Sequence, residues 1–134
     1  MSSGWIGVDL DGTLAEYTGW QGAAHIGAPV PAMVERVKRW LSEGRAVKVF
    51  TARVSFPNVP LIGKSKEVVD AAGRKFEADL AREAIKLWCV EHIGVELPIT
   101  NEKDYGMIEL WDDRAVQVEP NTGRPIGHST RGLS

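Results

Sequence analysis

The sequence contains little cysteine, no long apolar run and no large excess of charge of one sign. Its single cysteine, Cys89, cannot form an internal disulfide and has no cysteine partner for a metal site. No apolar run approaches the length of a membrane span, and the N-terminus lacks a basic region followed by a long apolar stretch. We therefore expect a cytoplasmic protein in a reducing compartment, without a membrane partner.

The charge balance also limits the function classes. The 16 basic and 18 acidic side chains leave a formal net charge of −2, so the composition gives no reason to expect broad attraction to nucleic acid. The composition does not exclude a local basic patch. The three histidines show no metal-ligand spacing, and each is expected to be structural or exposed. With 134 residues, of which 43% are hydrophobic and 25% charged, the chain fits one ordinary globular domain.

Short apolar runs alternate with helical patterns along the chain. Apolar residues recur at helical spacing from Pro31 to a stop at Gly44, and again from about Lys66 to His92. In the second helix the expected core stripe is Phe76, Leu80, Ala84, Leu87 and Trp88. Short apolar runs predict strands at residues 5–8, 46–50, 95–100, 107–111 and 115–118. This order predicts an α/β protein: a three-layer α/β/α, Rossmann-like fold around a mainly parallel sheet of about five strands.

Two carboxylates follow the first predicted strand. Asp9 and Asp11 lie two residues apart, so an extended segment points them in the same direction. Like charges held together favour a hard divalent cation such as magnesium, and Gly12 permits a sharp turn directly after them. Alone, an Asp-Gly pair is more often a simple turn after a strand. Further acids at the end of a later strand favour the functional interpretation.

Polar side chains also follow two other predicted strands. Thr51 ends the second strand, and its hydroxyl, with the backbone N–H groups of Ala52 and Arg53, is suited to binding a phosphate. Asp112 and Asp113 end the fourth, where buried acids need a cation or hydrogen-bond donors. The carboxyl ends of parallel strands meet at one edge of a sheet, so these groups are expected to converge with Asp9. Taken singly, each is also compatible with a purely structural role.

Lys103 lies in a polar loop between two predicted strands. From there an ammonium group can balance a carboxylate and hold a phosphate. Taken alone, a solvated surface lysine is the favoured interpretation.

The ordered set of Asp9-Leu10-Asp11-Gly12-Thr13-Leu14, Thr51, Lys103 and Asp112-Asp113 resembles the motifs of the haloacid dehalogenase superfamily of phosphohydrolases, over about residues 5–118. The resemblance implies that Asp9 attacks phosphorus and that Asp11 acts as acid and then base. It implies that Thr51 and Lys103 hold the phosphoryl group. It further implies that magnesium is bound by Asp9, the backbone carbonyl of Asp11, Asp112 and, directly or through water, Asp113.

The resemblance also divides the chain into parts. Residues 1–118 are expected to form the catalytic domain, with only a small flap near residues 14–28 in place of a large cap. Residues 119–134 are expected to be a loosely ordered tail. Such an open site suits a bulky substrate or closure by a second subunit of a homo-oligomer. The loop at residues 54–60 is a further candidate for substrate contact or oligomerisation.

These features predict that the protein is a magnesium-dependent phosphatase, which hydrolyses a small-molecule phosphomonoester through an aspartyl-phosphate. Asp11 favours phosphate chemistry, because dehalogenases of this superfamily typically lack the second aspartate. Two alternatives stay open. One is a phosphatase acting on nucleotides or nucleic-acid ends, and the other is a non-catalytic binding module with the same fold. The sequence does not identify the substrate.

Overall fold

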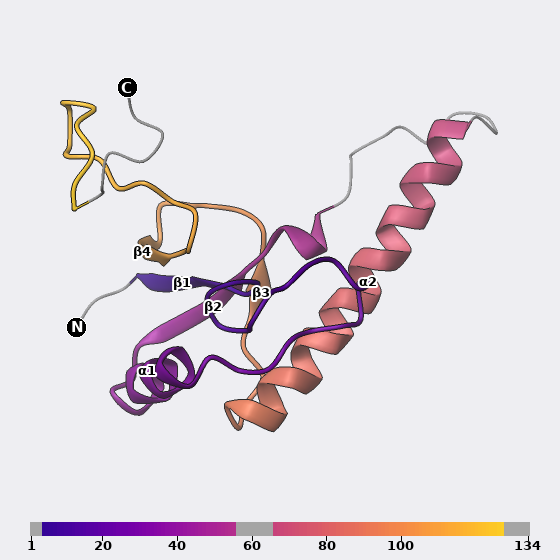
Figure 1. Cartoon of the computed structure of the whole chain (residues 1–134), viewed down its shortest axis with the longest axis horizontal. Coiled ribbons are helices and arrows are strands. Elements are labelled where there is room, and N and C mark those ends of the chain that lie inside the picture. The colour runs from indigo at the N-terminus through magenta and orange to yellow at the C-terminus, as the bar shows by residue number, and fades with distance from the viewer. Residues whose placement is uncertain (1–3, 56–65, 128–134) are drawn as a thin grey trace.

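The computed structural model describes residues 4–55 and 66–127, with residues 66–74 described by their backbone alone. The loop at 54–60, a candidate for substrate contact, lies from residue 56 onward outside the described residues. The elements follow an alternating order along the chain (Figure 1). They are β1 (Trp5–Asp9), α1 (Pro31–Ser42), β2 (Ala46–Phe50), the short 3-10 helix η1 (Ala52–Val54), α2 (Lys66–His92), β3 (Ile99–Thr100) and β4 (Met107–Trp111).

The four strands form one parallel sheet in the order β3-β2-β1-β4. β1 lies inside the sheet and pairs with β2 along its whole length, from Trp5 opposite Ala46 to Asp9 opposite Phe50. β3 is short, and it begins directly after Pro98, which has no backbone N–H to donate. The predicted parallel α/β arrangement is confirmed, with four strands in the described sheet and not about five.

The fifth strand predicted at residues 115–118 does not form. Val116 and Val118 alternate with polar residues as a strand would, but they are 40% and 51% exposed. Their segment instead folds back on residues 124–126, where Ile126 N–H donates to the Gln117 carbonyl at 2.7 Å. Alternation alone predicted a strand here. A fifth strand also needs a core face to bury its valines, and this segment has left the sheet.

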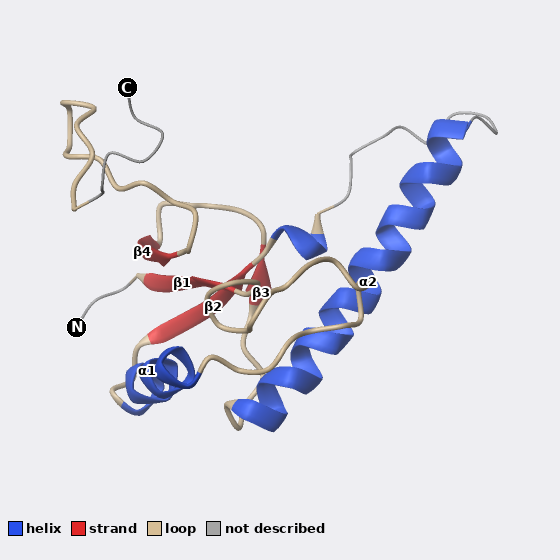
Figure 2. Ribbon diagram, in the orientation of Figure 1, coloured by secondary structure: helices blue, strands red, loops and turns tan. Residues whose placement is uncertain are grey.

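The core lies on one face of the sheet. Ile6 and Val8 of β1, and Val47 and Val49 of β2, are at most 3% exposed and belong to one cluster with the apolar faces of α1 and α2. The crossovers β1–α1–β2 and β2–α2–β3 step in the same direction across the sheet, so right-handed connections place both helices on the same face (Figure 2). A second helical layer, as expected for a three-layer fold, is not among the described residues. β3 and β4 are joined without a helix.

Helix α1 follows the predicted pattern. Pro31 occupies its first turn, where a missing N–H costs nothing, and Met33, Val34, Val37 and Trp40 are buried. The chain leaves the helix through Gly44 at φ +80°, a left-handed conformation that favours glycine. Burial of this apolar face fixes the helix against β2.

Helix α2 runs through Gly73 without a break, and of the predicted core stripe only Trp88 is fully part of its buried face. Phe76, Leu80 and Leu87 are 64%, 41% and 70% exposed. The buried residues are Ala78, Ala81, Ile85, Trp88 and Cys89. The helix packs through a mixture of small and large side chains, and the predicted stripe is wrong at Phe76, Leu80 and Leu87. No helix in the described part of the chain is long and apolar enough to cross a membrane.

Candidate active site

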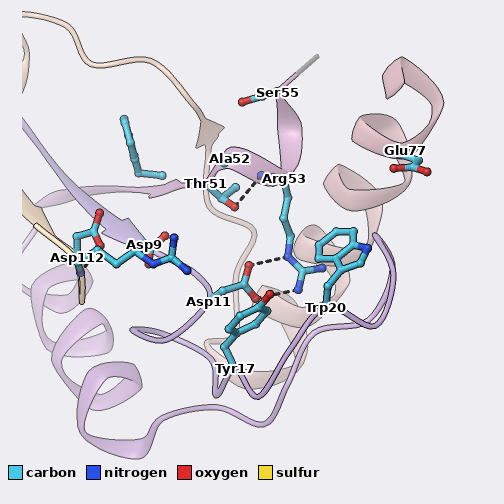
Figure 3. Close-up of a pocket in the computed structure, with 12 residues that line it drawn as sticks. Asp9, Asp11, Tyr17, Trp20, Thr51, Ala52, Arg53, Ser55, Glu77 and Asp112 are labelled. Carbon is cyan, nitrogen blue, oxygen red and sulfur yellow. Dashed lines mark hydrogen bonds and ion pairs between the residues drawn. The ribbon is translucent and has the colours of Figure 1, made fainter. Parts of the chain in front are cut away.

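Three strand ends place polar groups at one edge of the sheet. Asp9 is the last residue of β1, Thr51 follows β2 and Asp112 follows β4. They share a pocket of about 470 Å³ (Figure 3). The pocket is lined by Asp9, Asp11, Tyr17, Trp20, Phe50, Thr51, Ala52, Arg53, Ser55, Glu77, Asp112 and Arg114. The predicted convergence of the strand ends on one site is therefore observed.

The turn after β1 is held by its buried residues. Leu10 and Leu14 are fully buried, and the Leu10 carbonyl accepts from the backbone N–H of Leu14 at 3.0 Å. Gly12 adopts φ +88°, and a Cβ at this position would lie 2.5 Å from Oδ2 of Asp113. This φ favours glycine, and any Cβ here would also force the Asp113 carboxylate to move. The turn thus brings the Asp9 end of β1 directly against the end of β4.

Three carboxylates gather where these two strands end. Asp9, Asp112 and Asp113 each offer one oxygen, and these oxygens lie within 4.8 Å of one another. Burial, followed by the negative charge of Asp112 and then a hydrogen bond and charge at Asp113, raises the pKa of Asp9 from 3.8 to about 7. Hard oxygen ligands of like charge are the donor set that magnesium prefers. These three residues fit a divalent cation, which would relieve their repulsion.

Thr13 ties this cluster together, a role that the sequence did not reveal. Its hydroxyl accepts from the Asp113 backbone N–H at 3.1 Å and lies 3.5 Å from both Oδ2 of Asp9 and Oδ1 of Asp113. The Asp112 carboxylate is oriented separately, because it accepts from the Arg114 backbone N–H at 2.8 Å. The loops after β1 and β4 therefore form one connected unit.

The Asp11 side chain pairs with an arginine and not with the cluster of the other aspartates. Both of its carboxylate oxygens accept from Arg53, from Nε and from Nη2, each at 2.8 Å. The same guanidinium donates to the carbonyls of Gly22 and Ala23 in the flap, at 3.3 and 3.1 Å. It also lies over the ring of Trp20, with 5.0 Å from Cζ to the ring centroid. Arg53 therefore connects the second aspartate to the flap (Figure 3).

Arg53 was predicted to contribute its backbone N–H to a phosphate site. In the structure that N–H donates to the Thr51 hydroxyl at 3.1 Å, and the side chain makes the contacts with Asp11 and the flap. Thr51 is only 2% exposed, its hydroxyl oxygen accepts from the Arg53 backbone N–H, and the residue lines the pocket. Ala52 lines the pocket beside it.

Lys103 is the one predicted catalytic residue that the structure does not bring to the pocket. It is exposed in the loop between β3 and β4 and is not among the residues that line the cavity. That loop does reach the site at another point, since the Asn101 side chain donates to the Ser55 hydroxyl at 2.9 Å.

Several pocket residues carried no usable signal in the sequence. Tyr17 and Trp20 lie in the flap, Glu77 comes from α2 and Arg114 follows the acidic pair. The one signal that could have identified a member of this group is Trp20, a large aromatic residue in a loop rich in Gly and Ala. Only the fold brings Glu77 to the same cavity.

Comparisons with known proteins identify no family for this chain. No family model and no curated protein matches the chain. Among solved structures, it is similar to a conserved protein from Bacteroides thetaiotaomicron, with 22% identity and a TM-score of 0.49. The match covers 86% of this chain and 79% of that one. At this level of similarity it identifies no function.

Proposed function

We propose that the protein is a magnesium-dependent phosphatase of the haloacid dehalogenase type, which hydrolyses a phosphomonoester through an aspartyl-phosphate on Asp9. The observation that carries the proposal is the cluster of Asp9, Asp112 and Asp113 at the carboxyl edge of the sheet. Two of its members, Asp9 and Asp112, line one pocket with Asp11 and Thr51. In parallel sheets this edge is where ligands bind. The cluster combines a nucleophile with a cation site.

The first step belongs to Asp9. Its carboxylate oxygen attacks phosphorus in line with the leaving oxygen, the P–O bond to the alcohol breaks, and the alcohol leaves with a proton from the carboxyl group of Asp11. The Thr51 hydroxyl donates to a phosphoryl oxygen during the transfer. The product of this step is an acyl phosphate on Asp9 and a free alcohol.

The second step releases the phosphate. Asp11 removes a proton from water, the water oxygen attacks phosphorus, and the Asp9 carboxylate leaves with the electrons of the acyl P–O bond. Inorganic phosphate is released and the original Asp9 carboxylate is regenerated. Because Arg53 occupies both Asp11 oxygens, Asp11 must turn away from Arg53 in order to exchange protons with the reactants.

The metal would be held by Asp9, Asp112 and Asp113, with the Asp11 backbone carbonyl as the further ligand expected from the family. A bound magnesium ion would neutralise charge that otherwise keeps the phosphate away from the carboxylates. Asp112 is positioned for this role by the backbone N–H of Arg114. Lys103 would contribute a second positive charge only if the loop between β3 and β4 brought it toward the pocket.

Activity on an aryl phosphate tests the proposal. We expect p-nitrophenyl phosphate to be hydrolysed only with magnesium present, and Asp9→Asn to reduce kcat by roughly a thousandfold or more, as for other lost nucleophiles. The matched control is Asp79→Asn, the same chemical change at an exposed residue that pairs with Lys75 on α2. This control should keep the wild-type rate.

A broad panel of phosphomonoesters is also assayed, because the aryl phosphate alone is one substrate among many. If no member is hydrolysed at saturating magnesium, the enzyme assignment is wrong. Hydrolysis that persists in Asp9→Asn would show that another residue is the nucleophile.

A further inference from the structure

The outer part of the pocket is walled by aromatic side chains that the proposed chemistry does not use. Trp20 is 57% exposed and Tyr17 is 41% exposed, and both line the same cavity as Asp9 and Asp11. Figure 3 shows them on the flap side of the pocket, next to Arg53. A large apolar ring left open to solvent inside a concave site is a feature of ligand recognition.

The flap that carries these rings is anchored at its base. Glu16 N–H donates to the Ala28 carbonyl at 2.8 Å, and Val30 N–H donates to the Leu14 carbonyl at 2.9 Å. Gly27 is required here, because a Cβ at this position would lie 2.1 Å from the Glu16 carbonyl oxygen. The flap therefore returns to the core at two places, and its aromatic residues extend from a fixed base.

Trp20 is also held from one side. The Arg53 guanidinium lies 5.0 Å from its ring centroid, and that guanidinium is fixed in turn by two hydrogen bonds to Asp11. The Arg53 side chain is only 5% exposed, so this support is itself buried. One face of the indole is thus supported by a cation while the ring remains largely exposed. A preorganised ring loses little freedom when a second planar group stacks on it.

The size and charge of the cavity define what kind of planar group fits. Its volume of about 470 Å³ is more than a phosphate needs and lies within the range of roughly 300–1,000 Å³ typical of small-ligand pockets. Glu77 of α2 places a carboxylate on its wall, which can accept a hydrogen bond from an amino group but repels a second phosphate. A ring with N–H donors can therefore bond to this part of the wall, while Arg53 and Arg114 place cations on other parts of it.

We infer that the substrate is a nucleoside monophosphate, whose base stacks on Trp20 beside Tyr17 while its phosphate lies against Asp9 and Thr51. This inference rests on the proposed phosphatase function and adds the substrate class. Stacking on an aromatic side chain accepts any base, so we expect preference for the nucleotide over the bare sugar phosphate more than for one base over another.

The test compares substrates with and without a base. Adenosine, guanosine, cytidine and uridine 5′-monophosphates are each compared with ribose 5-phosphate, with magnesium present. We expect kcat/KM to be higher for the nucleotides by roughly tenfold, which is the effect of one base–aromatic stack, with most of the difference in KM. Trp20→Ala should bring this ratio close to one, and Trp20→Phe should retain most of it.

The matched control is Tyr105→Ala. Tyr105 is fully exposed in the loop between β3 and β4 and does not line the pocket, so its removal should leave the ratio unchanged. Equal kcat/KM values for nucleotides and ribose 5-phosphate in the wild type would overturn the inference. A nucleotide preference that survives in Trp20→Ala would do the same, and both results would leave the phosphatase function intact. Absence of hydrolysis of every phosphomonoester would instead refute the proposed function itself.

Discussion

Removing the negative charge of Asp9 should stabilise the metal-free protein while abolishing its activity. Asp9 is partly buried beside Asp112 and Asp113, and burial and these like charges raise its pKa from 3.8 to about 7. Because the folded-state pKa lies above the unfolded value, Asp9 contributes stability that is fully present below about pH 4 and is lost as pH rises through about 7. Asp9→Asn cannot ionise and so avoids this loss.

The magnitude follows from the same values. The rise from 3.8 to about 7 corresponds to about 4 kcal/mol as an upper bound. Since Asp9 is partly exposed to solvent, screening reduces the expected gain to about 1–2 kcal/mol. For a domain of 134 residues this is a rise in melting temperature of about 4–8 °C.

Thermal unfolding in EDTA measures the effect, at about pH 8 and at about pH 4. Asp9→Asn should melt above the wild type at the higher pH, and the two should melt together at the lower pH. Adding magnesium at about pH 8 should stabilise the wild type much more than the variant, because a cation relieves the repulsion and needs the Asp9 oxygen. Asp79→Asn, at an exposed carboxylate, should change the melting temperature little at either pH. A variant that melts below the wild type in EDTA at about pH 8 would refute this account of the carboxylate cluster.

Three other changes test separate parts of the site. Arg53→Lys cannot make both hydrogen bonds to Asp11, so we expect kcat to fall by roughly tenfold and limited proteolysis within the flap to become faster. An unchanged kcat together with an unchanged rate of proteolysis would show that Arg53 has no role in the site. Gly12→Ala places a Cβ against Asp113 at φ +88°, so chemical denaturation should show a loss of about 1–3 kcal/mol, and a stability equal to the wild type would contradict the turn geometry. Cys89 is fully buried and burial raises the pKa of its thiol to about 11, so a disulfide reagent should modify it only on unfolding; rapid labelling of the native protein would contradict this packing.

The sequence predicted the parts of the fold that depend on local pattern. The strands that end at Asp9, Phe50 and Trp111 were identified from short apolar runs, and the convergence of their ends follows from the rules of parallel sheets. The pattern failed where burial depends on the partner. Val116 and Val118 alternate like strand residues but have no sheet face to cover.

The contacts within the site could be predicted only in part. The spacing of Asp9 and Asp11 suggested that both carboxylates serve one cation, but the Asp11 side chain pairs with Arg53, 42 residues further along the chain. No local pattern encodes such a pairing, because it depends on where the flap and the loop after β2 meet. Trp20 was missed for the same reason, since its place in the pocket follows from its contact with Arg53.

The most direct test of the central claim is a crystal structure with magnesium and beryllium trifluoride, a mimic of a phosphoryl group bound to a carboxylate. The account predicts that the beryllium atom is bonded to a carboxylate oxygen of Asp9. Magnesium should lie among Asp9, Asp112 and Asp113, and the Thr51 hydroxyl should donate to a fluoride. Beryllium trifluoride on any other residue, or magnesium outside this cluster, would contradict it.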